Sequence, residues 1–227
     1  MWNWDFGLVN WKNGNKFRRA APRDRERRAG NRRRRGSLPR ALFGAKAGPH
    51  QKAIRQDRRA GPGGAPRLRQ TGERAQFVVE EQGRGIYLYI ETGEHAVRTG
   101  LSVGQQIYLH STSAGKVILS LLPDDRVNEI LDEYGLPPLT ENTITDSNEL
   151  KSQLDEIRER GYAFNREENI KGLRAVSGPV TDENDILIGV LSVSGPSHRM
   201  KGEWFQSGLP DLVLGTANEL ELRIAYA

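Results

Sequence analysis

The sequence contains no cysteine and no long run of apolar residues. Without cysteine, the chain can form neither a disulfide nor a cysteine-ligated metal site, and it suits a reducing cytoplasm. The first residues do not resemble a signal peptide, because Asp5 interrupts them. No segment approaches the roughly 20 apolar residues that span a membrane. We therefore expect a cytoplasmic protein that does not associate with membranes.

Side chains that could carry catalysis or bind a metal are also scarce. The four histidines lie far apart, without the paired spacing of metal ligands: His50, His95, His110 and His198. His110 precedes Ser111, but neighbours in sequence rarely form a catalytic pair, so a structural role is expected. The adjacent Glu167 and Glu168 are interpreted as a solvated pair. We predict no metal, no cofactor and no enzymatic activity.

The stretch Ser-Ala-Gly-Lys at residues 113–116 invites comparison with a phosphate-binding loop. That motif requires a glycine five positions before Gly115 and a hydroxyl residue after the lysine. His110 and Val117 occupy these positions. The sequence therefore predicts only the beginning of a helix here, with Ser111 or Ser113 available as the N-cap.

Charge is distributed very unevenly along the chain. Residues 1–70 contain 20 Lys and Arg but only 4 Asp and Glu, a net charge of +16, and residues 71–227 carry −11 of the chain's total of +5. A basic half of this kind favours binding to nucleic acid. The acidic half contains four lysines, a composition that suits high salt and a halophilic source.

Residues 1–70 are rich in Arg, Ala, Gly and Pro and show no helical or strand period. We expect this segment to be disordered, since it has too few apolar residues to offset chain entropy. Two interpretations stay open. The segment is either a genuine basic arm that binds phosphates nonspecifically, or the product of GC-rich DNA translated out of frame.

From Thr71 onward the pattern becomes that of a folded α/β (α+β) domain with a mostly antiparallel sheet flanked by helices. Strands are expected at residues 75–81, 84–91, 94–100, 162–165, 173–182 and 185–196, the last being central because it is almost continuously apolar. Helices are expected at residues 113–122, 123–135, 142–161 and 209–225. In the third helix, Asp146 and Glu149 resemble a capping box, Gly161 ends the helix, and the buried stripe is Leu150, Leu154 and Ile157. Gly83 lies in the connection between the first two strands. We predict a domain boundary at residues 70/71.

Two serines interrupt the apolar strand predicted at residues 185–196. Ser192 and Ser194 are two residues apart, so both side chains point to the same face of the sheet. Buried hydroxyl groups need partners, and these two either bond to neighbouring backbone or line a polar pocket. The helix that begins near Ser113 would offer such a pocket free backbone N–H groups that suit a small carboxylate.

Several segments together resemble a known family. "IYLHSTSAGKVILSLLP", "NTITDSNELKSQLDEIRERGYAFNREENIKGLRAVSGPV" and "LIGVLSVSGPSHR" are similar, in this order, to the effector-binding domain of IclR-type transcriptional regulators. The resemblance covers about residues 71–227. It implies a GAF-like α/β domain that normally follows a winged helix-turn-helix. It also implies a homodimer or homotetramer that binds promoter DNA under the control of a small organic or aromatic acid.

The resemblance implies that seven residues bind the effector: Ser113, Ala114, Asn165, Leu173, Ala175, Ser192 and Ser194. Two of them depart from family members that bind glyoxylate or pyruvate. Asn165 stands where those members have Asp, and Ala175 where they have Cys. Because an amide can donate hydrogen bonds where a carboxylate only accepts them, we expect a different acid or a neutral ligand.

No winged helix-turn-helix is recognisable in residues 1–70. We therefore predict a ligand-responsive DNA-binding regulator of the IclR type whose DNA-binding domain does not work in this chain. The alternative is a protein that binds nucleic acid nonspecifically through its basic N-terminal arm.

Overall fold

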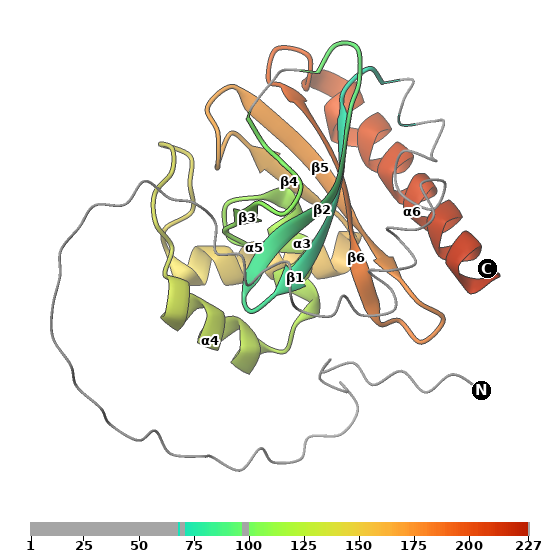
Figure 1. Ribbon diagram of the computed structural model, residues 1–227. Helices are drawn as coiled ribbons and strands as arrows, with labels where there is room; N and C mark the ends of the chain where they lie inside the picture. The colour runs from blue at the N-terminus through green and yellow to red at the C-terminus, as the bar shows by residue number, and fades with distance from the viewer. Residues whose placement is uncertain (1–67, 69–70, 97–99, 227) are drawn as a thin grey trace, which may run out of the picture. The chain divides into compact units, whose positions relative to one another are not determined.

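The computed structural model describes residue 68, residues 71–96 and residues 100–226. The basic segment predicted to be disordered, at residues 1–70, lies outside the described residues except for Leu68, which is buried in the apolar cluster that also contains Leu209 and Val213. The described part is an antiparallel sheet with helices packed on both faces (Figure 1). The predicted α+β class with a mostly antiparallel sheet is confirmed.

The sheet has six strands in the order β3-β2-β1-β6-β5-β4. Their bounds are β1 (Arg74–Glu81), β2 (Arg84–Thr92), β3 (Gln106–Ile107), β4 (Ala163–Arg166), β5 (Leu173–Thr181) and β6 (Leu187–Pro196). Every pair of neighbours is antiparallel. As its apolar sequence predicts, β6 lies in the middle of the sheet, where both of its faces are covered.

The connection between β1 and β2 is the tight turn that the sequence predicts around Gly83. Gln82 has φ 53° and Gly83 has φ 77°, a left-handed pair typical of a two-residue hairpin loop. The Gly83 N–H donates to Oε1 of Glu80 at 2.6 Å and closes the turn. A hairpin of this type fixes the register of the two strands.

The third strand predicted at residues 94–100 is wrong for the residues described there. Residues 94 and 95 form a turn, and residues 97–99 lie outside the described residues. The His95 N–H donates to the Gly72 carbonyl at 2.9 Å, which ties the turn back to the beginning of β1 instead of extending the sheet. The strand next to β2 is the short β3, whose Ile107 pairs with Gly85.

On one face of the sheet lies α3 (Ser113–Leu121), with α5 (Ser147–Arg160) packed against α3 and α4 (Asp124–Tyr134) on the same side. The caps of α5 agree with the sequence. Oδ1 of Asp146 accepts from the N–H groups at the start of α5, and Gly161 ends that helix with φ 79°. The apolar stripe of α5, formed by Leu150, Leu154 and Ile157, is buried in one cluster with the apolar residues of α3.

The opposite face is covered by α6 (Leu209–Ala225), which follows a short π-helix, η3 (Trp204–Gly208). Figure 1 shows α6 running along β5 and β6 on that face. Leu209, Val213 and Leu220 of α6 are buried there. Leu191 and Val193 of β6 belong to the same cluster. The domain therefore has two apolar clusters, one on each side of the sheet.

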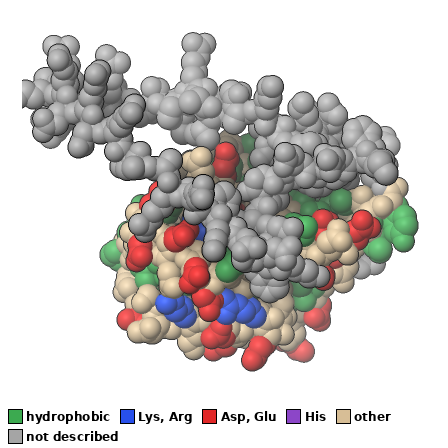
Figure 2. Space-filling view, turned by 90° about the horizontal axis from the view of Figure 1, so that it is seen from below, with side chains coloured by type: hydrophobic (Ala, Val, Ile, Leu, Met, Phe, Trp, Pro, Cys, Tyr) green, Lys and Arg blue, Asp and Glu red, His purple; other side chains and the backbone are tan. Residues whose placement is uncertain are grey.

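On the face that Figure 2 shows, Asp and Glu side chains are spread over the described surface, with Lys and Arg side chains beside some of them. This agrees with the acidic composition of residues 71–227. None of the helices in the described part combines the length and the apolar character needed to cross a membrane.

Candidate functional site

The register of the strands brings distant polar residues together on the face of the sheet that α3 covers. Ser194 of β6 lies between Arg74 of β1 and Ala175 of β5, and Ala175 in turn pairs with Asn165 of β4. Two residues along, Ser192 lies between Gln76 and Ser177. Since alternate residues share a face, both rows point toward α3.

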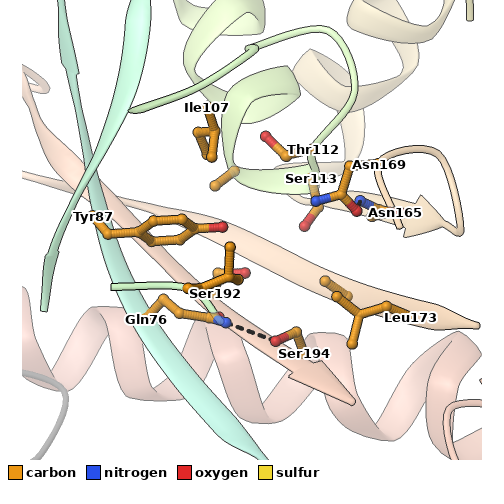
Figure 3. Close-up of a pocket in the computed structure, with 13 residues that line it drawn as sticks. Gln76, Tyr87, Ile107, Thr112, Ser113, Asn165, Asn169, Leu173, Ser192 and Ser194 are labelled. Carbon is orange, nitrogen blue, oxygen red and sulfur yellow. Dashed lines mark hydrogen bonds between the residues drawn. The ribbon is translucent and has the colours of Figure 1, made fainter. Parts of the chain in front are cut away.

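A small cavity lies between these rows and the beginning of α3. Figure 3 shows its polar side chains converging from the sheet and from α3. Its walls include all seven residues predicted to bind an effector: Ser113, Ala114, Asn165, Leu173, Ala175, Ser192 and Ser194. The structure thus brings all seven together, although binding itself stays a prediction.

The α3 end of the cavity is held by Thr112, and neither Ser111 nor Ser113 is the N-cap. Thr112 has extended backbone angles, and its Oγ1 accepts from the Gly115 N–H at 3.1 Å. Ser113 lies inside the helix, with its Oγ 2.7 Å from Oγ of Ser177. Ser111 precedes the cap and is fully buried. Thr112, Ser113 and Ala114, at the beginning of α3, line the cavity.

Gly115 has a structural function in this turn. A Cβ atom at Gly115 would lie 2.2 Å from the Leu109 carbonyl oxygen, a distance that no side chain tolerates. The glycine lets the segment before α3 pass directly against the helix. The glycine of the Ser-Ala-Gly-Lys stretch thus serves close packing.

Lys116, the last residue of this stretch, also has a structural function. Its Nζ is buried and forms an ion pair with Glu168, at 2.7 Å to Oε1 and 2.6 Å to Oε2, and it donates to Gln153 of α5 at 3.1 Å. Burial lowers the pKa of Lys116, and the charge of Glu168 opposes this effect. The prediction that Glu168 is solvated is wrong, because Glu168 lies folded inward against this lysine. Glu167 instead pairs with Arg174 near the surface, at 3.1 Å.

The ion pair is connected to the cavity through Asn165. The Glu168 N–H donates to Oδ1 of Asn165 at 3.0 Å, which leaves the Asn165 amide nitrogen to donate to the Ser111 carbonyl at 3.1 Å. The same nitrogen donates to Oδ1 of Asn169 at 2.8 Å. These bonds fix the orientation of the Asn165 side chain at the cavity wall and join α3 to the loop after β4.

His110 has the structural role that the sequence predicts. It is buried, and its Nε2 lies 3.2 Å from the Pro137 carbonyl oxygen. Burial lowers its pKa, which keeps the ring neutral. No group of three or more potential metal-ligating His, Cys, Asp or Glu residues occurs among the residues that the structure describes.

The sequence analysis missed six residues of the cavity wall: Gln76, Tyr87, Leu101, Ile107, Thr112 and Asn169. Gln76 could have been found, because it is a polar residue within the otherwise apolar start of the strand at residues 75–81. Tyr87 gave no signal, since a tyrosine on a strand is ordinarily a packing residue. Only the register places Tyr87 beside Val78, next to Gln76 on the same face.

The charge around the cavity comes from its surroundings and not from its lining. Its lining contains neutral hydrogen-bonding side chains and no charged ones. The buried guanidinium of Arg74 lies close enough to Tyr87 for the two groups to influence each other's titration. The N-terminus of α3 adds a partial positive charge at the other side.

The family of the chain follows from this domain. Residues 67–221 match the family model described as "Bacterial transcriptional regulator IclR C-terminal". The chain belongs to this family. The matched segment covers the whole described sheet and its helices, up to residue 221 in α6.

Curated proteins similar to this chain are transcriptional regulators. "Probable HTH-type transcriptional regulator ArcR" of Halobacterium salinarum is 34% identical over 161 residues, which is 70% of this chain and 61% of that protein. The p-hydroxybenzoate hydroxylase transcriptional activator of Acinetobacter baylyi is 34% identical over 121 residues, 53% of this chain and 45% of the activator. The chain thus spans about half to three fifths of the length of these relatives.

Solved structures share the fold. The Thermotoga maritima IclR structure superposes with a TM-score of 0.69 and 29% identity, covering 78% of this chain and 72% of that one. An inducer-binding domain of the PobR transcription factor from Acinetobacter, a double mutant in complex with 3-hydroxybenzoic acid, has a TM-score of 0.63 and 28% identity. It covers 68% of this chain and 91% of its own.

Proposed function

We propose that the domain at residues 71–227 binds a small organic acid or a similar polar metabolite, as the sensor of a transcriptional regulator of the IclR type. The observation that carries this proposal is the cavity at the start of α3, where seven residues from four separate segments meet. The seven comprise Ser113 and Ala114 of α3, Asn165 of β4, Leu173 and Ala175 of β5, and Ser192 and Ser194 of β6. A cavity with convergent polar groups is the usual form of a ligand site.

The arrangement suits an acid. A carboxylate near Ser113 would meet the backbone N–H groups and the positive end of α3. The amide nitrogen of Asn165 and the serine hydroxyls of β6 add neutral donors around it. Two similar proteins support this chemistry: one is a transcriptional activator of p-hydroxybenzoate hydroxylase, and the other is an inducer-binding domain in complex with 3-hydroxybenzoic acid.

Binding would act by shifting a population of conformations. A ligand bound between α3 and the sheet stabilises the arrangement of these elements that fits it best. In the family architecture this bias would pass through a homodimer or homotetramer to the spacing of the DNA-reading units at a promoter. Such a regulator works in the cytoplasm and carries out no catalysis.

Calorimetric titration of small carboxylic acids tests the proposal. We expect wild-type protein to bind at least one acid, and Ser192→Ala and Ser194→Ala to bind it about tenfold more weakly, as expected for loss of one hydrogen bond to a charged group. Ser120→Ala is the matched control. Its hydroxyl is buried in α3 but donates to the Val117 carbonyl at 2.8 Å, outside the cavity. Equal affinity of the wild type and both cavity variants would contradict the proposal.

The DNA-binding half is a separate proposal. The family match begins at residue 67, so all but the last four residues of the basic segment 1–70 lie outside the matched domain. We propose that this segment, at residues 1–70, replaces the winged helix-turn-helix as a product of out-of-frame translation. Reading the nucleotide sequence of codons 1–75 in all three frames tests it. A second frame that encodes a winged helix-turn-helix supports the replacement, and its absence contradicts it.

A further inference from the structure

The Tyr87 side chain lines the cavity, and its hydroxyl group is free to bond to a ligand there. The residue is only 5% exposed and lies on β2, across the cavity from α3. Figure 3 shows its ring lying along the cavity with the hydroxyl directed toward the space between the sheet and Ser113. That hydroxyl makes no hydrogen bond with any residue of the described part of the chain. The hydroxyl is not enclosed by the chain and opens on the cavity, where it can bond to a partner from outside the chain.

The protonation state of Tyr87 determines what such a partner can be. Burial raises the pKa of Tyr87 to about 12, and the charge of Arg74 opposes this effect. At neutral pH the side chain is therefore a phenol, which donates one hydrogen bond to an oxygen atom. The nearby guanidinium of Arg74 favours an oxygen that carries negative or partial negative charge.

Gln76 supplies the complementary group beside Tyr87. Its Nε2 donates to Oγ of Ser194 at 2.7 Å, but its Oε1 is buried and accepts no hydrogen bond within the described residues. Gln76 is only 2% exposed, so water does not readily satisfy this oxygen. The β1–β2 side of the cavity thus combines an unused donor with an unused acceptor.

We propose that Tyr87, with Gln76, determines the specificity of the site for an acid that also carries a hydroxyl group. A hydroxyl is the smallest group that can accept from the Tyr87 phenol and donate to Oε1 of Gln76. The acid group of the same ligand lies at the other side, against the first turn of α3. The inference rests on the proposed function, because it assigns the second end of a ligand already expected in this cavity.

Titration of matched pairs of acids with wild-type protein and Tyr87→Phe tests the inference. The pairs are 3-hydroxybenzoate with benzoate, lactate with propionate, and malate with succinate. For at least one pair, the wild type binds the hydroxylated acid roughly tenfold more tightly, the usual worth of one or two hydrogen bonds. In Tyr87→Phe the hydroxylated acid loses this advantage, whereas the affinity for its partner changes less than about twofold.

A purely structural role for Tyr87 predicts a different pattern. In that case Tyr87→Phe would lower the Tm of the unliganded protein and would weaken the binding of both acids of a pair equally. We expect an unchanged Tm, because the hydroxyl has no partner among the described residues. Tyr134→Phe is the matched control. The Tyr134 hydroxyl donates to the Gln82 carbonyl at 2.7 Å, away from the cavity, so its loss leaves the hydroxyl preference intact.

The possible outcomes separate the two proposals. If wild-type protein binds acids without preferring the hydroxylated member of any pair, the inference is wrong and the proposed function stands. The same holds if Tyr87→Phe retains the full preference. If wild-type protein binds no acid of the three pairs, both the inference and the acid-sensing function are overturned.

Discussion

The two faces of the sheet differ in chemistry although the same strands supply both. On β6, Leu191 and Val193 point to the α6 side and join a wholly apolar cluster. Ser192 and Ser194, which alternate with them, point to the α3 side and line the cavity. The α6 face is thus packed with apolar side chains, whereas part of the α3 face is a cavity lined by polar side chains. The polar side is where we expect substitutions to affect both stability and binding.

Breaking the buried ion pair should have the largest effect. Lys116→Met leaves Glu168 charged and without its partner in the interior, which costs about 3–5 kcal/mol of the free energy of unfolding. Because the Glu168 N–H also orients Asn165, we expect weaker ligand binding as well. Urea denaturation and calorimetry measure the two effects. A double variant, Lys116→Met with Glu168→Leu, should recover much of the stability.

Leu191→Ala is the comparison on the opposite face. It removes a fully buried side chain from the α6 cluster, and we expect a loss of about 3 kcal/mol with unchanged affinity per folded molecule. If this variant weakened binding as strongly as Lys116→Met does, the two faces would not be functionally distinct.

A smaller loss of stability is expected from removing the N-cap of α3 or that of α5. Thr112→Ala and Asp146→Ala each remove a side chain that accepts from the first turn of a helix, at about 1 kcal/mol each. Only Thr112 lines the cavity. We expect Thr112→Ala to weaken acid binding and Asp146→Ala to leave it unchanged. Thr112→Ser, which retains the hydroxyl, should restore both properties. Equal binding by both alanine variants would refute a role for the α3 terminus.

The smallest effect concerns pH. Burial lowers the pKa of His110 below its ordinary value of 6.5, so the folded state binds its proton less readily than the unfolded chain does. The stability that the neutral His110 ring contributes to the folded state is fully present above pH 6.5. It decreases as the pH falls from 6.5 toward the pKa of His110 in the folded protein. Urea midpoints at pH 7.5 and 5.5 measure it. We expect His110→Gln to show a shallower decline, and an identical decline would argue against His110 as its source.

The sequence predicted those features that depend on local periodicity and caps. The apolar stripe of α5, its Asp146 cap and Gly161, and the hairpin at Gly83 all follow from nearest neighbours along the chain. The third strand at residues 94–100 was wrong because a hydrogen bond to Gly72, 23 positions earlier in the chain from His95, ends the sheet there. Local pattern carries no information about such a contact.

The same distinction between local pattern and long-range contact applies to the candidate site. Ser192 and Ser194 share a face by the period of a strand alone, so the sequence determined their orientation. The sequence did not determine that Tyr87 and Gln76 complete the cavity, or that Glu168 lies inward against Lys116. Strand register and the docking of α3 on the sheet decided these points, because both arise from burying apolar surface between segments far apart in the chain.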